Sequence, residues 1–251
     1  MSDKSRFCHE RGVVFLETQE LTKTYRVGSI DVPALCGVDF VASQGDFAVI
    51  NGPSGSGKTT FLNLISVIDR PSQGEVRIEG QATSRLSEGQ LAQLRKTKIG
   101  LIFQTFNLIP VLSAAENVEY PLLLRRLPKD ERRRRVAALL DEVGLGDLAD
   151  RRPNELSGGQ RQRVAIARAL VTRPKMVLAD EPTANLDSET GKRVMERMRD
   201  LNENHCVLFV VVTHDPAVSA YAQRHIRILD GRIEEASSKE ERHDVVLDSA
   251  S

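Results

Sequence analysis

Several features that would assign a chain to a particular class are scarce in this sequence. It has only three cysteines, Cys8, Cys36 and Cys206. An odd number at such wide spacing fits a disulfide scaffold or a metal knuckle poorly and favours a reducing compartment. Lysine plus arginine and aspartate plus glutamate both number 35, so no overall basic charge favours a nucleic-acid partner, although a local patch stays open.

Long apolar segments are also missing. The strongest apolar run, residues 206–212, is far shorter than the roughly 20 residues that span a bilayer. The polar residues 1–11 lack the apolar stretch of a secretory signal. These absences predict a cytoplasmic chain that meets a membrane only through a partner. We also find no internal repeat and no low-complexity tract.

The clearest positive feature is a glycine-rich segment between an apolar strand, 47–50, and an amphipathic helix. Its pattern, Gly-x-x-x-x-Gly-Lys-Thr, is typical of a phosphate-binding loop, because glycines let backbone N–H groups turn inward and the helix start adds positive potential. A chance glycine-rich turn is the alternative, which this context disfavours. The predicted nucleotide-binding residues are Gly52, Pro53, Ser54, Gly55, Ser56, Gly57, Lys58, Thr59 and Thr60.

At 251 residues the chain could be one large domain or two small ones, and its strand and helix patterns predict an α/β protein. We expect a strand-rich part first, then helices interrupted by one strand, then alternating strands and helices with a final hairpin. Expected strands are 13–16, 38–41, 46–50, 75–80, 99–103, 176–181, 207–212, 225–229 and 232–235. Expected helices begin near residues 58, 86, 114, 129, 158 and 188, and the fourth of them starts after Pro128.

Three further segments have the composition of ligand-binding sites. Ser157-Gly158-Gly159-Gln160 precedes a helix and is either a second anion-binding helix start or an ordinary capped helix. Asp180 and Glu181 end a buried strand, as acids do that hold magnesium and activate water in P-loop enzymes. His214 follows another strand, so it belongs either to the ligand edge of an open sheet or to a simple turn.

The arginine run Arg132 to Arg135 has two interpretations. It could be a nucleic-acid patch, but Asp130 and Glu131 lie four residues before Arg134 and Arg135. Such spacing places opposite charges side by side on a helix and favours a solvated face. We therefore predict no nucleic-acid partner.

The motifs occur in an order that resembles the ATPase subunit of an ABC transporter, over about residues 13–235. The order is the loop 52–59, Gln104 after a strand, Leu156 to Gln160, Asp180-Glu181 and His214. The resemblance implies a P-loop NTPase fold with a RecA-like core, a small antiparallel β subdomain and an inserted α-helical subdomain. It implies ATP and Mg²⁺ as cofactors and a head-to-tail homodimer of ATPase subunits.

The resemblance also implies a role for each matching residue. Tyr25 matches the position that stacks on adenine, Glu181 the general base and His214 the histidine that contacts the γ-phosphate. The implied magnesium residues are Thr59, Gln104 and Asp180, and Gln104 is also expected at the catalytic centre. The residues expected to act on the nucleotide of the other copy are Ser157, Gly158, Gly159, Gln160 and Asp187.

Further matches, at 103–110, 115–122 and 180–187, are similar to the lipoprotein-releasing, macrolide-exporting and cell-division group. Ala184 departs from the glycine expected there. The resemblance implies a subunit that powers export, with membrane subunits docking near Phe106 to Leu112. A regulatory ATPase that moves no solute is the alternative. Proteins acting on ribosomes or DNA are disfavoured because a second cassette or a long coiled-coil insertion is missing.

The predicted domain limits follow from these matches. Residues 1–12 form a loose leader, 13–235 the ATPase domain and 236–251 a polar tail. Within the domain, 13–85 and 154–235 form the core with its β subdomain, and 86–153 the helical insertion.

Overall fold

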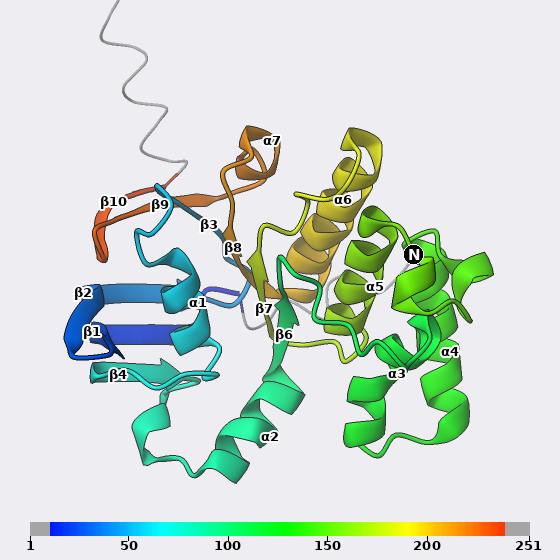
Figure 1. Ribbon diagram of the computed structural model, residues 1–251, viewed down its shortest axis with the longest axis horizontal. Helices are drawn as coiled ribbons and strands as arrows, with labels where there is room; N and C mark the ends of the chain where they lie inside the picture. Colours follow the sequence, from blue (N-terminus) through cyan, green and yellow to red (C-terminus); the bar gives the residue numbers. More distant parts are fainter. Residues whose placement is uncertain (1–10, 239–251) are drawn as a thin grey trace, which may run out of the picture.

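The fold consists of two β-sheets and a helical layer (Figure 1). The computed structural model describes residues 11–238, and for 235–238 the backbone only. The predicted leader up to residue 10 and the predicted tail after residue 238 lie outside the described residues. None of the helices within the described range combines the length and apolar character that a membrane span requires.

The central sheet has six strands in the order β10-β9-β3-β8-β7-β6. Every neighbouring pair is parallel except the β9–β10 hairpin. Its strands are β3 (Phe47–Asn51), β6 (Ile99–Ile102), β7 (Met176–Asp180), β8 (Leu208–Val212), β9 (Arg224–Leu229) and β10 (Arg232–Ser238). The apolar runs seen in the sequence are the buried strands of this sheet, as expected when helices cover both faces.

The second sheet is antiparallel, with the order β2-β1-β4-β5. Its strands are β1 (Val14–Val27), β2 (Ile30–Ser43), β4 (Gln73–Ile78) and β5 (Gln81–Ala82). β1 and β2 are much longer than the predicted strands 13–16 and 38–41. Their pairing register shifts between Thr18 and Leu21, where Glu20 has a φ of 45°. Such a bulge interrupts the apolar alternation on which the prediction relied.

Helices cover the sheets and also form a separate layer. Helix α1 packs between the two sheets, where the Phe40 and Phe61 rings meet edge to face at 5.6 Å. α5 and α6 cover the other face of the central sheet, over the stacked rings of Phe47 and Phe209. The helices are α1 (Lys58–Ile65), α2 (Glu88–Lys98), α3 (Ala114–Leu124), α4 (Lys129–Glu142), α5 (Gly158–Leu170), α6 (Ser188–His205) and α7 (Pro216–Ser219), with short 3₁₀ turns at Thr83–Arg85, Gly146–Leu148 and Pro153–Glu155.

The predicted helical range 86–153 contains one strand of the core sheet. β6 pairs in parallel with β7, from Ile99 opposite Met176 to Ile102 opposite Ala179. The helices that pack as a unit are α3 and α4, which share a cluster with α5 that includes Val118, Leu140 and Val164. The chain therefore returns to the core before it builds the helical layer.

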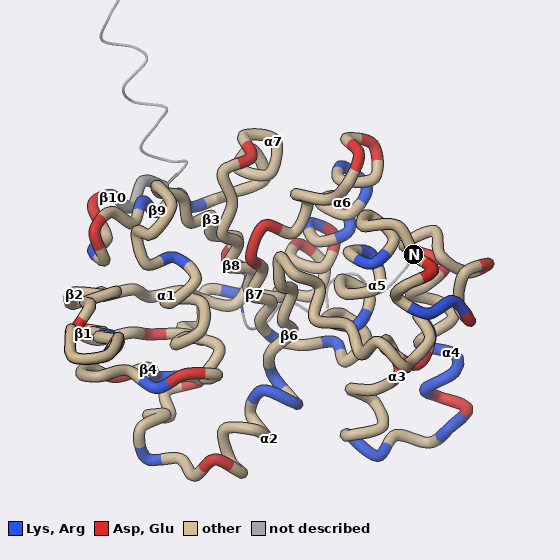
Figure 2. The backbone as a smooth tube through the Cα atoms, in the orientation of Figure 1, with Lys and Arg blue, Asp and Glu red and all other residues tan. Residues whose placement is uncertain are grey.

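Charges of both signs are spread over the molecule (Figure 2). On α4, Arg132 bonds to Glu119 of α3 at 2.7 Å and Arg135 pairs with Glu131. The Arg135–Glu131 pair has the predicted spacing of four residues, whereas the Arg132–Glu119 pair joins α4 to α3 with its side chains only 16% and 23% exposed.

The parallel strands bring distant residues to one edge. Ile50 and Asp180 both pair with Val212 in the register of β8. The loops that leave β3, β6, β7 and β8 therefore emerge side by side.

Candidate functional site

The glycine-rich loop lies between β3 and α1 and is held close to neighbouring backbone. A Cβ on Gly52 would lie 2.1 Å from the Ile228 carbonyl oxygen, and one on Gly57 would lie 2.4 Å from the Ala34 carbonyl oxygen. Gly57 also has a φ of 102° and precedes α1 without a side-chain cap. Only glycine fits both positions, and the first N–H groups of α1 are left to bind an anion.

A cavity of about 610 Å³ opens over this loop. It brings together most of the predicted site, because the loop 52–60 apart from Ser56 meets four residues from other loops there. Those four are Gln104, Asp180, Glu181 and His214. Ser56 is instead buried, and its hydroxyl has no hydrogen-bond partner among the described residues.

Lys58 folds back over the loop. Its Nζ donates to the carbonyl oxygens of Gly52 at 2.8 Å and Pro53 at 2.6 Å. These two carbonyl oxygens hold the ammonium group over the loop, at the rim of the cavity. A phosphate entering the cavity would compete with them for the same charge.

Thr59 and Asp180 face each other across the cavity. The Thr59 hydroxyl donates to Asp180 Oδ2 at 3.1 Å. Burial raises the pKa of Asp180 above its usual value; the neighbouring Glu181 charge adds to the rise, while Thr59 and Lys58 oppose it. A carboxylate in this position favours a nearby cation.

Glu181 is held by donors from the loop after β8. Its Oε1 lies 2.6 Å from His214 Nδ1 and accepts from the His214 N–H at 3.1 Å. Its Oε2 accepts from the Thr213 hydroxyl at 2.9 Å. Glu181 itself has a φ of 47°, a costly conformation that persists where surrounding contacts enforce it.

Thr213 is a site residue that the sequence reasoning missed. It is buried, and its Oγ1 accepts from the Asp215 N–H at 3.0 Å while donating to Glu181. The only available signal was its place at the end of β8, next to His214. Strand ends carry many polar residues, so that signal did not single it out.

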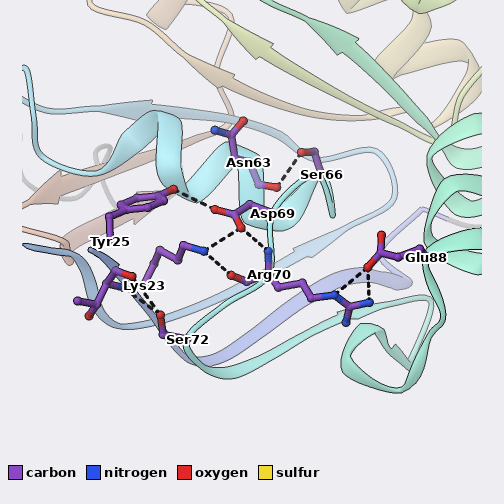
Figure 3. A network of polar contacts seen from close by, with 9 residues as sticks. Lys23, Tyr25, Asn63, Ser66, Asp69, Arg70, Ser72 and Glu88 are labelled. Carbon is purple, nitrogen blue, oxygen red and sulfur yellow. Dashed lines mark hydrogen bonds and ion pairs between the residues drawn. The ribbon is translucent and has the colours of Figure 1, made fainter. Parts of the chain in front are cut away.

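Tyr25 lies outside this cavity, in a polar network of the β1 and β4 region (Figure 3). Its hydroxyl donates to Asp69 Oδ2 at 3.1 Å, and Lys23 Nζ lies 4.9 Å from the Tyr25 ring centre and 2.8 Å from Asp69 Oδ1. Burial would raise the pKa of Asp69, but the bonds from Lys23, the Arg70 N–H and Tyr25 lower it overall. The network fixes the orientation of the Tyr25 ring.

The segment 157–160 also lies outside the cavity. The Ser157 hydroxyl accepts from the Gln160 N–H at 3.2 Å, and Gln160 Oε1 accepts from the Ser157 N–H at 2.8 Å. This capping box starts α5, so the interpretation as a capped helix describes the local geometry. Asp187 is the N-cap of α6, where its carboxylate accepts from the Thr190 N–H at 2.9 Å.

Known proteins of similar sequence and fold identify the family of this chain. Residues 35–184, more than half of the chain, match the family model described as ABC transporter. The chain belongs to the ABC transporter family. A Thermotoga maritima protein named as an uncharacterized ABC transporter ATP-binding protein is 49% identical over 219 residues, covering 87% of this chain and 93% of its own.

Two further relatives bear on the fold and the assembly. A macrolide export ATP-binding/permease protein MacB of Syntrophobacter fumaroxidans is 49% identical, but this chain spans only 31% of it. The cassette MJ0796 of Methanocaldococcus jannaschii, solved as a post-hydrolysis dimer bound to ADP and Pi, superposes with a TM-score of 0.86 at 44% identity, over 89% of this chain and 98% of that one. This ABC ATPase therefore has the predicted P-loop NTPase fold.

Proposed function

We propose that two copies of this ABC ATPase close on two ATP molecules, hydrolyse them and open again, driving a membrane partner of the export type. The convergence of Lys58, Thr59, Asp180, Glu181 and His214 on one cavity carries this proposal. These residues supply donors, a cation-binding carboxylate and a base. The capped helix start 157–160 does not line this cavity, and in the proposed dimer it would act on the nucleotide of the other copy.

The proposed base is Glu181. A carboxylate offers about four lone-pair positions, and the His214 ring, the His214 N–H and the Thr213 hydroxyl occupy three of them. One position on Oε2 is left to take a proton from water. His214, 85% exposed at its side chain, is able to turn toward the γ-phosphate.

Magnesium fits the residues of the cavity. Thr59 and Asp180 already place a hydroxyl and a carboxylate together, and Gln104 adds an amide oxygen. Magnesium prefers oxygen ligands and keeps waters and substrate phosphates in its shell. This agrees with the lack, within residues 11–238, of any group of three acidic, histidine or cysteine side chains that could hold a metal alone. When bound, the ion would neutralise charge on the β- and γ-phosphates.

The remaining predicted residues complete the proposed site. The ring of Tyr25 would stack on adenine, oriented by Asp69 and Lys23. Ser157 to Gln160 and Asp187 would come from the second copy. Donors from both chains stabilise the transferred phosphate only when water is excluded between them.

The concentration dependence of ATP hydrolysis tests the paired site. Specific activity of the purified chain should rise steeply with protein concentration until the dimer is populated. Size-exclusion chromatography with light scattering, at the same concentrations, gives the matching populations. Full activity in a strictly monomeric sample would overturn the proposal.

The proposed dock for the membrane partner is the loop from Phe106 to Leu112. Arg168 donates to the carbonyl oxygens of Phe106 at 2.7 Å and Asn107 at 2.5 Å, so the loop is held in shape. Leu108 packs against the α3–α5 cluster, whereas Val111 is 72% exposed. An exposed apolar side chain on a fixed loop suits an interface.

A charge at this loop should uncouple hydrolysis from transport. Val111→Asp is the cleaner probe, because charge at Phe106 or Leu108 also disturbs local packing. In a reconstituted complex we expect basal ATPase activity to persist while transport is lost. Undiminished coupling would place the dock elsewhere.

We place the protein on the inner face of the membrane, bound through this partner. The regulatory alternative, an ATPase that signals without moving a solute, shares every residue of the site. Purification of the complex from detergent-solubilised membranes, followed by transport assays, separates the two. Nucleic acid is not part of either proposal, since the Arg132 and Arg135 charges are paired with acids.

A further inference from the structure

Two hairpins of this ATPase have turns of the same kind. Asp230 and Gly231 join β9 to β10 with φ angles of 45° and 74°. Glu79 and Gly80 join β4 to β5 with φ angles of 50° and 74°. Positive φ at both residues is typical of the type I′ turn and favours glycine at the second position. The two turns therefore make the same local demand for glycine.

The surroundings of the two glycines differ. Gly80 is exposed, and a Cβ on it would meet no atom of the described residues within 4 Å beyond its chain neighbours. Gly231 is buried, and a Cβ on it would lie 2.9 Å from the Ala34 carbonyl oxygen and 3.0 Å from Leu35 Cα. Gly231 is therefore needed for its contact with β2 as well as for its turn.

Gly231 joins the phosphate loop to β2 through both of its backbone polar groups. Its N–H donates to the Ser56 carbonyl oxygen at 3.0 Å, and its carbonyl oxygen accepts from the Cys36 N–H at 2.9 Å. Ser56 lies in the loop that follows β3, whereas Cys36 lies on β2 of the antiparallel sheet. The hairpin that carries Gly231 lies beside β2 (Figure 1). One residue at the tip of this hairpin thus bridges the two sheets.

The phosphate loop has further close contacts with the hairpin and with β2. The Ile228 carbonyl oxygen lies 2.1 Å from the position of a Cβ on Gly52. The Ala34 carbonyl oxygen, which faces Gly231, lies 2.4 Å from the position of a Cβ on Gly57. These contacts join backbone to backbone, so no side chain can turn away to relieve a displacement. The loop is therefore enclosed between the hairpin and β2.

The two ends of the nucleotide site belong to different parts of the fold. Tyr25, which we propose to stack on adenine, lies on β1, and the phosphate loop follows β3 of the central sheet. β1 pairs with β2, where Thr22 lies opposite Cys36. One ATP molecule has to reach both ends, and elements already held in the right relative position bind it more tightly.

We propose that Gly231 is a positioning residue that holds the phosphate loop in register with the β subdomain and thereby sets the affinity for ATP. This inference rests on the proposed roles of Tyr25 and the loop. Gly231 does not line the nucleotide cavity, so it acts through the segments that it joins. The atoms nearest to a Cβ on Gly231 belong to β2, so a side chain there moves the β subdomain away from the loop.

A matched pair of alanine substitutions tests this role in the full chain. Gly231→Ala and Gly80→Ala place a Cβ at the same φ of 74°, so the variants share the strain of the turn. Only Gly231→Ala adds a clash with β2. By isothermal titration calorimetry we expect Gly231→Ala to weaken MgATP binding about tenfold and Gly80→Ala to change it less than about twofold, because small displacements of binding groups are costly.

Magnesium tripolyphosphate shows whether Gly231 aligns two elements or only shapes the loop. This probe carries the phosphates of ATP but no adenine, so its binding does not depend on the position of Tyr25. We expect Gly231→Ala to change its affinity less than about twofold, while MgATP affinity falls about tenfold. In a Tyr25→Ala chain, where the ring is missing, Gly231→Ala should weaken MgATP binding much less than in the wild type.

The possible outcomes are distinct. Equal MgATP affinities in the two alanine variants would overturn the proposal, and so would equal losses of MgATP and tripolyphosphate affinity in Gly231→Ala. A wild-type chain that binds no MgATP would instead contradict the proposed function. Thermal melts establish that each variant is folded. If Gly231→Ala does not fold, Gly231→Asn and Gly80→Asn provide the same comparison with less strain, because asparagine tolerates positive φ.

Discussion

Two helices of this ABC ATPase, α1 and α5, begin at glycine-rich segments. The N–H groups of their first turns are satisfied differently. α1 follows Gly57 and has no side-chain cap. α5 follows Ser157, whose hydroxyl and the Gln160 amide close a complete capping box. The first start is thus open toward a cavity, and the second is satisfied by its own side chains.

The difference indicates how each start meets a ligand. Uncapped N–H groups at α1 lose little when a phosphate binds, because water is their only competitor. At α5 the side-chain cap already accepts a hydrogen bond from one of the N–H groups of the first turn. An interaction of α5 with nucleotide therefore has to use its remaining N–H groups and the Ser157 hydroxyl, and it depends on another surface to bring the phosphate there.

The largest expected effect is on ATP hydrolysis at the cavity over α1, where two substitutions distinguish the chemical step from nucleotide binding. Glu181→Gln removes the base and should lower kcat by about 10² to 10⁴, with MgATP affinity retained and a closed dimer accumulating. Lys58→Ala should instead lose nucleotide binding in a titration, since it removes the charge over the loop. Wild-type turnover in Glu181→Gln would show that the base lies elsewhere.

A matched pair of glycine substitutions addresses the two starts directly. Gly57→Ala places a Cβ 2.4 Å from the Ala34 carbonyl oxygen at a φ of 102°, and should lower the free energy of unfolding by about 1–3 kcal/mol. Gly158→Ala meets nothing within 4 Å and should raise it by about 0.5–1 kcal/mol. Urea unfolding of both variants measures these changes.

In Gly57→Ala and Gly158→Ala, the change in ATPase activity should not follow the change in the free energy of unfolding. If α5 approaches the nucleotide of the second copy, Gly158→Ala lowers ATP hydrolysis while stabilising the monomer. Unchanged hydrolysis in that variant would count against an interaction through this helix start.

The cap of α5 has a smaller effect. Ser157→Ala removes the acceptor of the Gln160 N–H and should lower the free energy of unfolding by about 1 kcal/mol. Ser157→Thr keeps the oxygen and should restore most of that loss. Equal unfolding curves for the alanine variant and the wild type would show that the cap contributes nothing.

The smallest effect concerns Asp180. The pKa of Asp180 is raised in the folded chain, chiefly by burial. The contribution of this carboxyl group to folding stability is therefore fully present below the ordinary pKa of 3.8 and is lost as the pH rises through the folded-state pKa. Asp180→Asn should therefore raise the melting temperature at pH 7, by about 2–4 °C for each kcal/mol relieved. Melts without nucleotide between pH 4 and pH 8 should show the gain shrink toward the acid end.

Much of the fold was accessible from patterns of residues. The parallel core strands appear as short apolar runs, and the capped start at Ser157 appears as Ser followed by Gln three residues later. β1 and β2 were underestimated because a bulge near Glu20 breaks their alternation. Local patterns predict elements well where the pattern is unbroken.

In the candidate site, the sequence predicted the residues of the motifs but not the residues that hold them in place. Lys58, Thr59, Asp180, Glu181, Gln104 and His214 were named from motifs, and all of them line one cavity. Thr213 and Asp69 were not named, although they hold Glu181 and Tyr25 in place. Supporting residues are ordinary polar residues in the sequence, and only their partners distinguish them.

The glycine-rich loop and its lysine were determined by local sequence, since a tight turn before a helix needs only adjacent residues. The strand register brings Asp180 and the loop before His214 to the end of β3. These relations are long-range, because hydrogen bonds join β3 to β8, more than a hundred residues further along the chain, and so tertiary structure alone decided them.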